Sequence, residues 1–137
     1  MTASRESSAT DISALCTECG LEDYPKLLGG SFGYECHTVS ENGRIIAALF
    51  LQTVGDESDV LGIATLPEYR RRGCAEKLLR DAAKGRKLTL EVRESNFPAI
   101  ALYKKVGFTE IRVIGKYYGN ENGILMAVDM RNENTGI

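Results

Sequence analysis

The chain has 137 residues, 43% of them hydrophobic and 26% charged, and its formal net charge at pH 7 is −2. These values are typical of one globular domain with its own core, which we expect to extend over residues 1–137. The slightly acidic balance of charges argues against a nucleic-acid partner. Because no apolar run reaches the roughly 18 residues of a membrane span and no apolar signal core opens the chain, we expect a cytoplasmic protein without a membrane partner.

The N-terminal part of the chain predicts a tail and two short helices. Residues 1–10 are polar and small, which predicts a flexible tail. Asp11 is a suitable N-cap for a first short helix. A second short helix is expected over residues 21–28, where Gly29 and Gly30 would end it.

Three strands are expected next. Residues 34–39, 44–54 and 60–66 are rich in apolar and β-branched side chains. Turn signals separate them, namely Glu-Asn-Gly at 41–43 and Gly-Asp-Glu-Ser at 55–58. Because short turns join the strands, we expect neighbouring strands to pair antiparallel.

The hydrophobic pattern then changes to a helical period. Apolar residues recur about every 3.6 positions from Ala75 to Ala83, and the stretch Lys84-Gly85-Arg86 ends this helix. Leu88, Leu90 and Val92 then alternate with polar residues, as in a strand. A strand, a helix and a strand in this order predict a βαβ unit with parallel strands and a right-handed crossover. Ligands of open α/β sheets collect at the carboxyl ends of such strands.

Arg70, Arg71 and Arg72 stand at the expected start of this helix, followed by Gly73 and, at a small position, Ala75. A helix start offers unpaired N–H groups and a positive dipole end, and glycine lets the backbone approach a ligand closely. Guanidinium groups add paired donors for phosphate oxygens. The stretch therefore predicts a pyrophosphate site, with a solvated arginine cluster as the alternative. It matches neither the P-loop nor the dinucleotide fingerprint.

The cysteines suggest a metal or redox site only weakly. Cys16 and Cys19 have a metal-like spacing, and Cys36 with His37 could complete four ligands. Adjacent Cys and His are poor geometry for one ion, and no strand precedes the first pair as a thioredoxin-like motif requires. We therefore expect reduced, partly buried thiols and no bound metal. Nothing in the sequence places a nucleophile near His37, the single histidine.

A second helix is expected near the C-terminal third of the chain. Asn96 is a suitable N-cap, Pro98 fits the first turn and Gly107 ends the helix. Apolar or aromatic side chains lie on one face at positions i, i+3, i+4 and i+7, namely Ala99, Leu102, Tyr103 and Val106.

Three motifs carry a resemblance to a known family. RRRGCA at 70–75 is similar to the Q/R-x-x-G-x-G/A signature of the GNAT superfamily of N-acetyltransferases. LEVRESNFPAIALYKKVGF at 90–108 and KYYGNENGILM at 116–126 resemble the RimI branch of that superfamily. The resemblance extends from about Tyr34 to Met130.

The resemblance implies an α/β (α+β) fold of GNAT type: a mixed, mostly antiparallel twisted sheet with a central βαβ acetyl-CoA-binding unit and flanking helices. It implies acetyl-CoA as the acetyl donor, and no metal. RimI-type enzymes acetylate an N-terminal α-amine, typically an alanine of a ribosomal protein. The implied partner is thus an acceptor peptide or protein N-terminus, a ribosomal protein among the candidates, bound by a monomer or weak dimer.

The resemblance also implies catalytic roles. Glu91 in "LEV" matches the general base, and Tyr103 in "ALYKKVGF" matches the proton donor to the CoA thiolate. From the residues alone, Glu91 has an alternative as a solvated strand residue that pairs with Arg93 on the same face. A tyrosine at the position of Tyr103 is usually a core residue.

Further positions match the donor site of the family. The strand residues that would pair with the pantetheine arm are Ile63, Ala64 and Thr65, and this strand resembles one that splays from residues 88–92 to open a cleft. Residues 71–76 match the phosphate loop, in which Glu76 replaces a residue that is often basic. Asn96 matches a contact to acetyl-CoA as well as a helix cap. Cys74 occupies the variable position of the motif, where a helix N-terminus can lower the pKa of a thiol.

The acceptor side is less fully specified. Tyr117 and Tyr118 match paired tyrosines that either line the acceptor groove or pack on the sheet. The chain has no tryptophan, and the helices expected before Tyr34 are shorter than the family's first helical region, which helps to form the acceptor wall. Two alternatives therefore stay open: an acetyltransferase for a small amine or a lysine, and a non-catalytic acyl-CoA-binding module.

Overall fold

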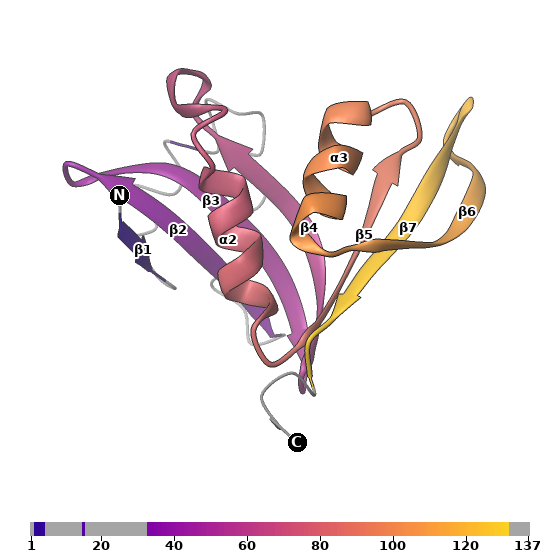
Figure 1. The fold of residues 1–137 in the computed structure, drawn as a ribbon, viewed down its shortest axis with the longest axis horizontal. Coiled ribbons are helices and arrows are strands. Elements are labelled where there is room, and N and C mark those ends of the chain that lie inside the picture. The colour runs from indigo at the N-terminus through magenta and orange to yellow at the C-terminus, as the bar shows by residue number, and fades with distance from the viewer. Residues whose placement is uncertain (1, 5–14, 16–32, 132–137) are drawn as a thin grey trace.

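A computed structural model describes residues 2–4, 15 and 33–131 of the chain. In these residues a seven-stranded sheet has the order β1-β2-β3-β4-β5-β7-β6 (Figure 1). Every neighbouring pair is antiparallel except β4 with β5. The strands are β1 Thr2–Ser4, β2 Tyr34–Glu41, β3 Arg44–Val54, β4 Glu57–Thr65, β5 Lys87–Arg93, β6 Thr109–Tyr118 and β7 Glu121–Asp129.

Within residues 33–131, the sheet is covered by helices α2 at Cys74–Ala83 and α3 at Phe97–Val106. Figure 1 shows α2 in front of β2 and β3, and α3 beside β5, on the side of that strand that faces β4. A short 3-10 helix, η2 at Pro67–Tyr69, connects β4 to the loop before α2. Within the described residues, no helix is long and apolar enough to cross a membrane.

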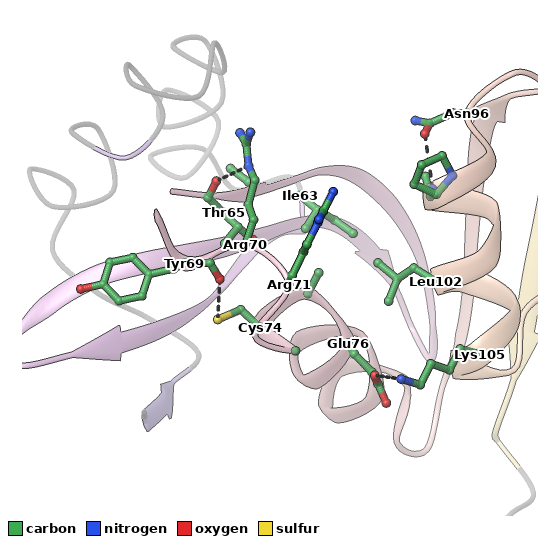
Figure 2. Close-up of a pocket in the computed structure, with 15 residues that line it drawn as sticks. Ile63, Thr65, Tyr69, Arg70, Arg71, Cys74, Glu76, Asn96, Leu102 and Lys105 are labelled. Atoms are coloured by element: carbon green, nitrogen blue, oxygen red, sulfur yellow. Dashed lines mark hydrogen bonds and ion pairs between the residues drawn. The ribbon is translucent and has the colours of Figure 1, made fainter. Parts of the chain in front are cut away.

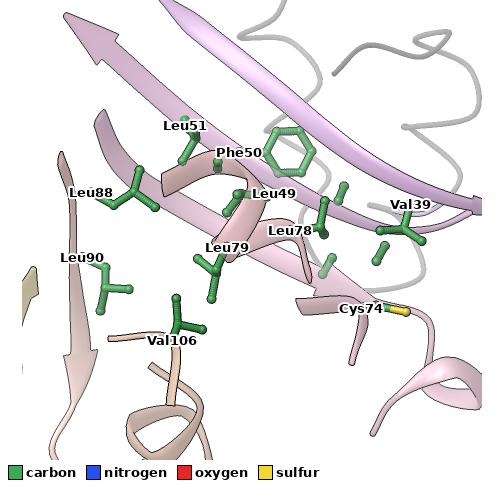
Figure 3. Packing of buried hydrophobic residues seen from close by; sticks show 14 of the residues in the cluster. Val39, Leu49, Phe50, Leu51, Cys74, Leu78, Leu79, Leu88, Leu90 and Val106 are labelled. Carbon is green, nitrogen blue, oxygen red and sulfur yellow. The ribbon is translucent and has the colours of Figure 1, made fainter. Parts of the chain in front are cut away.

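The core lies between these helices and the sheet because both carry apolar stripes on the facing side. Leu79 of α2 and Val106 of α3 are buried beside Leu88 and Leu90 of β5 (Figure 3). Each fully buried leucine side chain contributes on the order of 2 kcal/mol of hydrophobic free energy. This packing fixes the positions of both helix N-termini relative to the sheet.

The predicted strand pattern is largely confirmed. β3 spans Arg44–Val54, the predicted range, and β2, β3 and β4 pair antiparallel. Asn42 and Gly43 of the first hairpin turn have φ values of 53° and 77°. Positive φ at both central positions is what this Asn-Gly signal predicts.

Two of the expectations need correction. The expected tail contains strand β1, in which Ala3 pairs with Val39, because the outer edge of β2 offers backbone groups that a third strand can bond. β4 begins at Glu57 and not at residue 60, because its polar start pairs with β3 on one side and β5 on the other. The remaining tail residues and the helices expected at Asp11 and at 21–28 lie outside the described residues.

The parallel pair β4 and β5 joins only at one end. The strands pair at Glu57 with Lys87, Ser58 with Leu88, and Asp59 with Thr89, and the pairing then stops. A bulge in β4 shifts its register against β3, because Phe50 faces Gly62 whereas Leu51 faces Val60. Such bulges bend a strand and increase its twist. The two strands therefore diverge towards their carboxyl ends, as the family resemblance implies (Figure 1).

A cluster of polar side chains connects the strands at the end where β4 and β5 are paired. The Arg86 Nη1 donates to Ser58 Oγ at 2.8 Å and lies 3.3 Å from a carboxylate oxygen of Glu35. Thr53 Oγ1 lies 2.8 Å from the same Ser58 hydroxyl. Arg86 thereby connects the segment before β5 to β2, β3 and β4.

The Glu35 carboxylate makes this cluster sensitive to acid. Burial on its own raises the pKa of Glu35, but hydrogen bonds from Thr53, His37 and Arg86 outweigh it and lower the pKa to about 2. A depressed pKa adds stability that is present above the unfolded-state value of 4.5 and is lost as pH falls towards 2.

We expect the Glu35→Gln variant to lose most of this acid sensitivity. Between pH 7 and pH 3, wild type should lose about 2 kcal/mol of unfolding free energy through Glu35, whereas the variant should not. Urea unfolding of both proteins at the two pH values measures the difference. Equal losses in both would show that Glu35 is not the titrating group.

Candidate active site

A pocket of about 810 Å³ opens where β4, the η2–α2 loop and the start of α3 meet (Figure 2). It lies at the carboxyl end of β4, where the βαβ prediction places a ligand. Its lining residues are Ile63, Ala64, Thr65, Tyr69, Arg70, Arg71, Gly73, Cys74, Ala75, Glu76, Asn96, Pro98, Ala99, Leu102 and Lys105. Ten of these were expected at a donor site from the sequence, namely residues 63–65, 70, 71, 73–76 and 96, whereas Arg72 and Tyr103 do not line the pocket.

The loop before α2 turns sharply through two left-handed residues. Arg71 has φ of 66° and Gly73 has φ of 80°. Positive φ is rare for a residue such as arginine, and at Gly73 it explains why glycine is required. Gly73 is the N-cap of α2 without any side-chain cap bond, and a Cβ built on it would meet no atom within 4 Å. The start of α2 is therefore open to an anionic ligand.

The three arginines have different surroundings. Arg70 Nε donates to the Thr65 carbonyl oxygen at 3.1 Å, as Figure 2 shows, and Arg71 lines the pocket. Arg72 does not line it, because its guanidinium lies over the Tyr69 ring, 5.1 Å from the ring centre. Of the three arginines expected at a phosphate site, Arg70 and Arg71 therefore line the pocket.

Cys74 faces the core. It is 2% exposed and its Sγ lies 4.0 Å from the Tyr69 carbonyl oxygen. Burial, and after it the charge of Glu41, raises the pKa of Cys74. The expected lowering by the helix N-terminus is thus wrong, because desolvation of the thiolate outweighs the helix dipole. Cys74 can contribute its backbone to the loop, and its thiol is a core group.

The opposite wall of the pocket comes from α3. Asn96 Oδ1 accepts from the Ala99 N–H at 3.3 Å, and Gly107 ends the helix, so both predicted caps are confirmed. Lys105 Nζ lies 3.1 Å from a Glu76 carboxylate oxygen and so connects α3 to α2 across the pocket (Figure 2). Glu76 also pairs with Arg80 at 2.8 Å.

Sequence reasoning did not single out Tyr69, Pro98, Ala99, Leu102 or Lys105 as pocket residues. Pro98, Leu102 and Lys105 follow one another at i, i+4 and i+7, so they form one stripe of α3. That stripe is visible in the sequence, but only the packing of α3 beside α2 shows that it faces a ligand pocket.

Glu91 lies on the face of β5 opposite its buried residues. It is exposed, and its carboxylate forms no hydrogen bond or ion pair with the described residues. Arg93, its expected partner, instead pairs with Glu121 at 3.5 Å and lies over the Tyr118 ring, 4.4 Å from the ring centre. The alternative in which Glu91 pairs with Arg93 is therefore wrong for this structure.

Tyr103 is half-buried on α3, and its ring packs against Phe108 with the ring centres 5.7 Å apart. Burial, and after it the charge of Tyr118, raises the pKa of Tyr103. Burial also raises the pKa of Tyr118, with further contributions from the charges of Tyr117 and Glu91. Both phenols therefore stay protonated at neutral pH, and Tyr118 is within electrostatic range of both Glu91 and Tyr103.

Tyr117 and Tyr118 lie at the end of β6 with their ring centres 4.9 Å apart. A Cβ built on Gly123 of β7 would come within 3.2 Å of atoms in both side chains. Gly123 pairs with Arg93, so its missing side chain leaves the room that the tyrosines occupy on the Glu91 face of the sheet. Gly123 is a second position that the sequence analysis did not single out.

The remaining candidates form no metal site among the described residues. No group of three His, Cys, Asp or Glu residues there could hold an ion. His37 Nε2 lies 3.0 Å from Glu35 Oε1, and Cys36 is a buried thiol. Cys16 and Cys19 lie outside the described residues.

The comparisons with known proteins agree with this geometry. The acetyltransferase (GNAT) domain family matches residues 33–110. The chain belongs to the GNAT family and is an acetyltransferase.

Two relatives with N-terminal acetyltransferase names extend this assignment. The chain is 39% identical over 100 residues to the [Ribosomal protein bS18]-alanine N-acetyltransferase of Escherichia coli (strain K12), covering 66% of this chain and 68% of that protein. It is 46% identical over 76 residues to the N-alpha-acetyltransferase of Saccharolobus solfataricus, covering 50% of this chain and 46% of that protein. The predicted RimI type is thereby confirmed.

The fold is confirmed by a solved structure. The crystal structure of the alanine N-acetyltransferase of ribosomal protein S18 from Escherichia coli superposes with a TM-score of 0.77 and 28% identity. The superposition covers 97% of each chain. The GNAT fold predicted from the motifs is therefore the fold that the structure shows.

Proposed function

We propose that this acetyltransferase transfers an acetyl group from acetyl-CoA to the N-terminal α-amine of a protein, a ribosomal-protein alanine among the acceptors. The observation that carries the proposal is the exposed Glu91 carboxylate, which has no ionic partner in the described residues and lies on a strand that diverges from β4. The names of the relatives support the α-amine as acceptor.

The donor fits the pocket between β4 and α3. The edge of β4 at residues 63–65, which lines the pocket, can pair with the amide groups of the pantetheine arm, as a strand would. The start of α2, with Arg71 beside it, suits the pyrophosphate, because N–H groups, helix dipole and guanidinium all favour anions. The thioester end would then point towards the divergence of β4 and β5.

The pKa of an α-amine explains why a single carboxylate, Glu91, suffices as the general base. An α-amine has a pKa of about 8, so its deprotonation at pH 7 costs about 1.4 kcal/mol, whereas a lysine costs about 4.6 kcal/mol. Glu91 takes the proton from the attacking amine as the N–C bond forms. The C–S bond then breaks and the electron pair stays on the CoA sulfur.

Tyr103 fits a role at the leaving sulfur. A phenol is a weaker acid than a thiol by about 1.5 pKa units, so complete proton transfer to the thiolate is unfavourable. Burial raises the pKa of Tyr103 further, which keeps its proton in place. We therefore assign it the donation of a hydrogen bond to the developing thiolate.

A peptide experiment tests the proposed acceptor. Peptides with a free α-amine and one internal lysine, beginning with Ala, Ser, Met or Gly, are incubated with the protein and acetyl-CoA. Mass spectrometry should place the acetyl group on the α-amine, most strongly after Ala or Ser. Acetyl on lysine alone, or only on added small amines, would contradict the proposal and favour a different acceptor.

Glu76 should reduce donor affinity in the wild-type protein. Its carboxylate neutralises Lys105 at the pocket wall, so we expect Glu76→Gln to tighten acetyl-CoA binding about 2- to 5-fold. The gain should shrink at high salt. Isothermal titration calorimetry at low and high salt measures both effects.

The matched control for Glu76 is Asp81→Asn. Asp81 pairs with Lys77 at 3.4 Å on the same helix and does not line the pocket. This variant removes an equal charge and should leave acetyl-CoA affinity at the wild-type value. Equal affinity changes in both variants would indicate a general charge effect and not a local one.

A further inference from the structure

Arg93 is the side chain that could form an ion pair with Glu91, but its guanidinium contacts other groups. Glu91 and Arg93 lie two residues apart on one face of β5, a separation of about 7 Å along the strand, which an arginine side chain can span. In the structure the Arg93 guanidinium lies over the Tyr118 ring, 4.4 Å from its centre, and 3.5 Å from a Glu121 carboxylate oxygen.

Glu121 is itself fixed in place. Its Oε1 accepts from the backbone N–H of Ser95 at 2.8 Å, and its side chain is one-quarter exposed. The hydrogen bond with Ser95, and to a smaller degree Arg93, lowers the pKa of Glu121, so it stays ionised at neutral pH. The carboxylate is therefore an anchored anion that attracts Arg93 away from β5.

The other charged groups around Glu91 are farther away or already engaged. On the β7 side, the strand neighbour of Glu91 is Leu125. Leu125 in turn pairs with Arg112 of β6, so Arg112 lies one strand farther from Glu91. On the β4 side, Asp59 accepts a hydrogen bond from Thr89. Tyr118 is protonated, as described above. Arg93 is thus the neighbouring cation on the same strand.

We propose that Glu121 is a positioning residue that holds Arg93 away from Glu91 and so keeps the Glu91 carboxylate available to accept the proton of the acceptor amine. This inference rests on the proposed function for its effect on catalysis. The structural claim, that Arg93 pairs with Glu121 and not with Glu91, does not depend on the proposed function.

The physical consequence follows from how ion pairs affect bases. A guanidinium beside a carboxylate favours the ionised form, which makes the carboxylate a weaker proton acceptor. A weaker base is a slower general base. If the charge of Glu121 is removed, Arg93 can instead form an ion pair with Glu91, which lies on the same strand.

The kinetic test uses four variants. Glu121→Gln keeps an oxygen that can accept from the Ser95 N–H and loses the charge that attracts Arg93. We expect kcat for an N-terminal peptide to fall about 3-fold, and the acid limb of its pH profile to move about one unit lower, while KM for acetyl-CoA stays unchanged. In the double variant with Arg93→Met and Glu121→Gln, kcat and the position of the acid limb should return towards the values of the Arg93→Met single variant.

The control is Glu110→Gln, which removes a carboxylate from β6 that pairs with Lys104 at 3.6 Å. It should behave like wild type. A purely structural role of Glu121 in the β6–β7 hairpin predicts the opposite pattern for the double variant, because removing both partners would disturb the hairpin further. Loss of activity without recovery in the double variant would therefore overturn the inference.

A direct titration separates this inference from the proposed function. Carboxyl ¹³C NMR of glutamate-labelled protein, with the Glu91 signal assigned through Glu91→Gln, needs no acceptor. The titration midpoint of Glu91 should move about one pH unit lower in Glu121→Gln and return in the double variant. An unchanged midpoint would overturn the inference. If the Glu91 midpoints shift as expected but the protein does not acetylate α-amines, only the proposed function is overturned and the inference stands.

Discussion

In the Glu91→Gln variant, kcat for an N-terminal peptide is expected to fall about 100- to 1,000-fold, because a positioned general base contributes about that much. Glutamine keeps the size of the side chain but cannot take the proton from the amine. The Glu91 side chain is exposed and forms no hydrogen bond or ion pair with the described residues, so its replacement should leave the fold and its stability nearly unchanged.

Binding and turnover should separate in this variant. Glu91 does not line the donor pocket, so the Kd for acetyl-CoA, measured by calorimetry, should equal that of wild type. The rate should recover partly at high pH, where the acceptor amine has already lost its proton. A variant that turns over at the wild-type rate would remove Glu91 from the mechanism, and a variant that loses acetyl-CoA affinity would assign it to the donor site.

The Tyr103→Phe variant is expected to lose about 10- to 100-fold in kcat, because it removes one hydrogen bond to the leaving sulfur. The phenylalanine ring fills the same space and keeps the contact with Phe108. The thermal midpoint should therefore stay close to the wild-type value. Thiol release monitored with a chromogenic disulfide measures the rate.

Tyr34→Phe serves as the control for this change. Tyr34 is half-buried at the start of β2, on a different element from α3, and its variant should retain wild-type turnover. If Tyr103→Phe also retained it, the phenol would be a core group and another donor would have to serve the sulfur. A large drop in the thermal midpoint of Tyr103→Phe would instead indicate that its hydroxyl stabilises the fold.

Locally encoded features were predictable from the sequence. β3, the Asn42-Gly43 turn and both caps of α3 agree with the structure, because each depends on residues within a few positions of one another. The same holds for Gly73, whose conformation is set by the turn into α2. The motif resemblance added the family, which the comparisons confirm.

Errors arose where a side chain had a choice of partners. Arg72 lies over Tyr69 and not at the pocket, although it belongs to the same run of arginines as Arg71. Cys74 stands at a helix start, but its direction into the core raises the pKa of its thiol. A position in the sequence fixes neither the direction of a side chain nor its solvation.

By itself, the sequence determined strand β3, the starts of α2 and α3, and the residue types that acetyl transfer needs, because periodicity, caps and motifs are local properties. Only the tertiary structure decided two other features: the Lys105–Glu76 contact between α3 and α2, and the pairing of Arg93 with Glu121. Each of these joins segments that are distant in the chain. Packing of the whole sheet and its helices sets their distances, and local pattern does not.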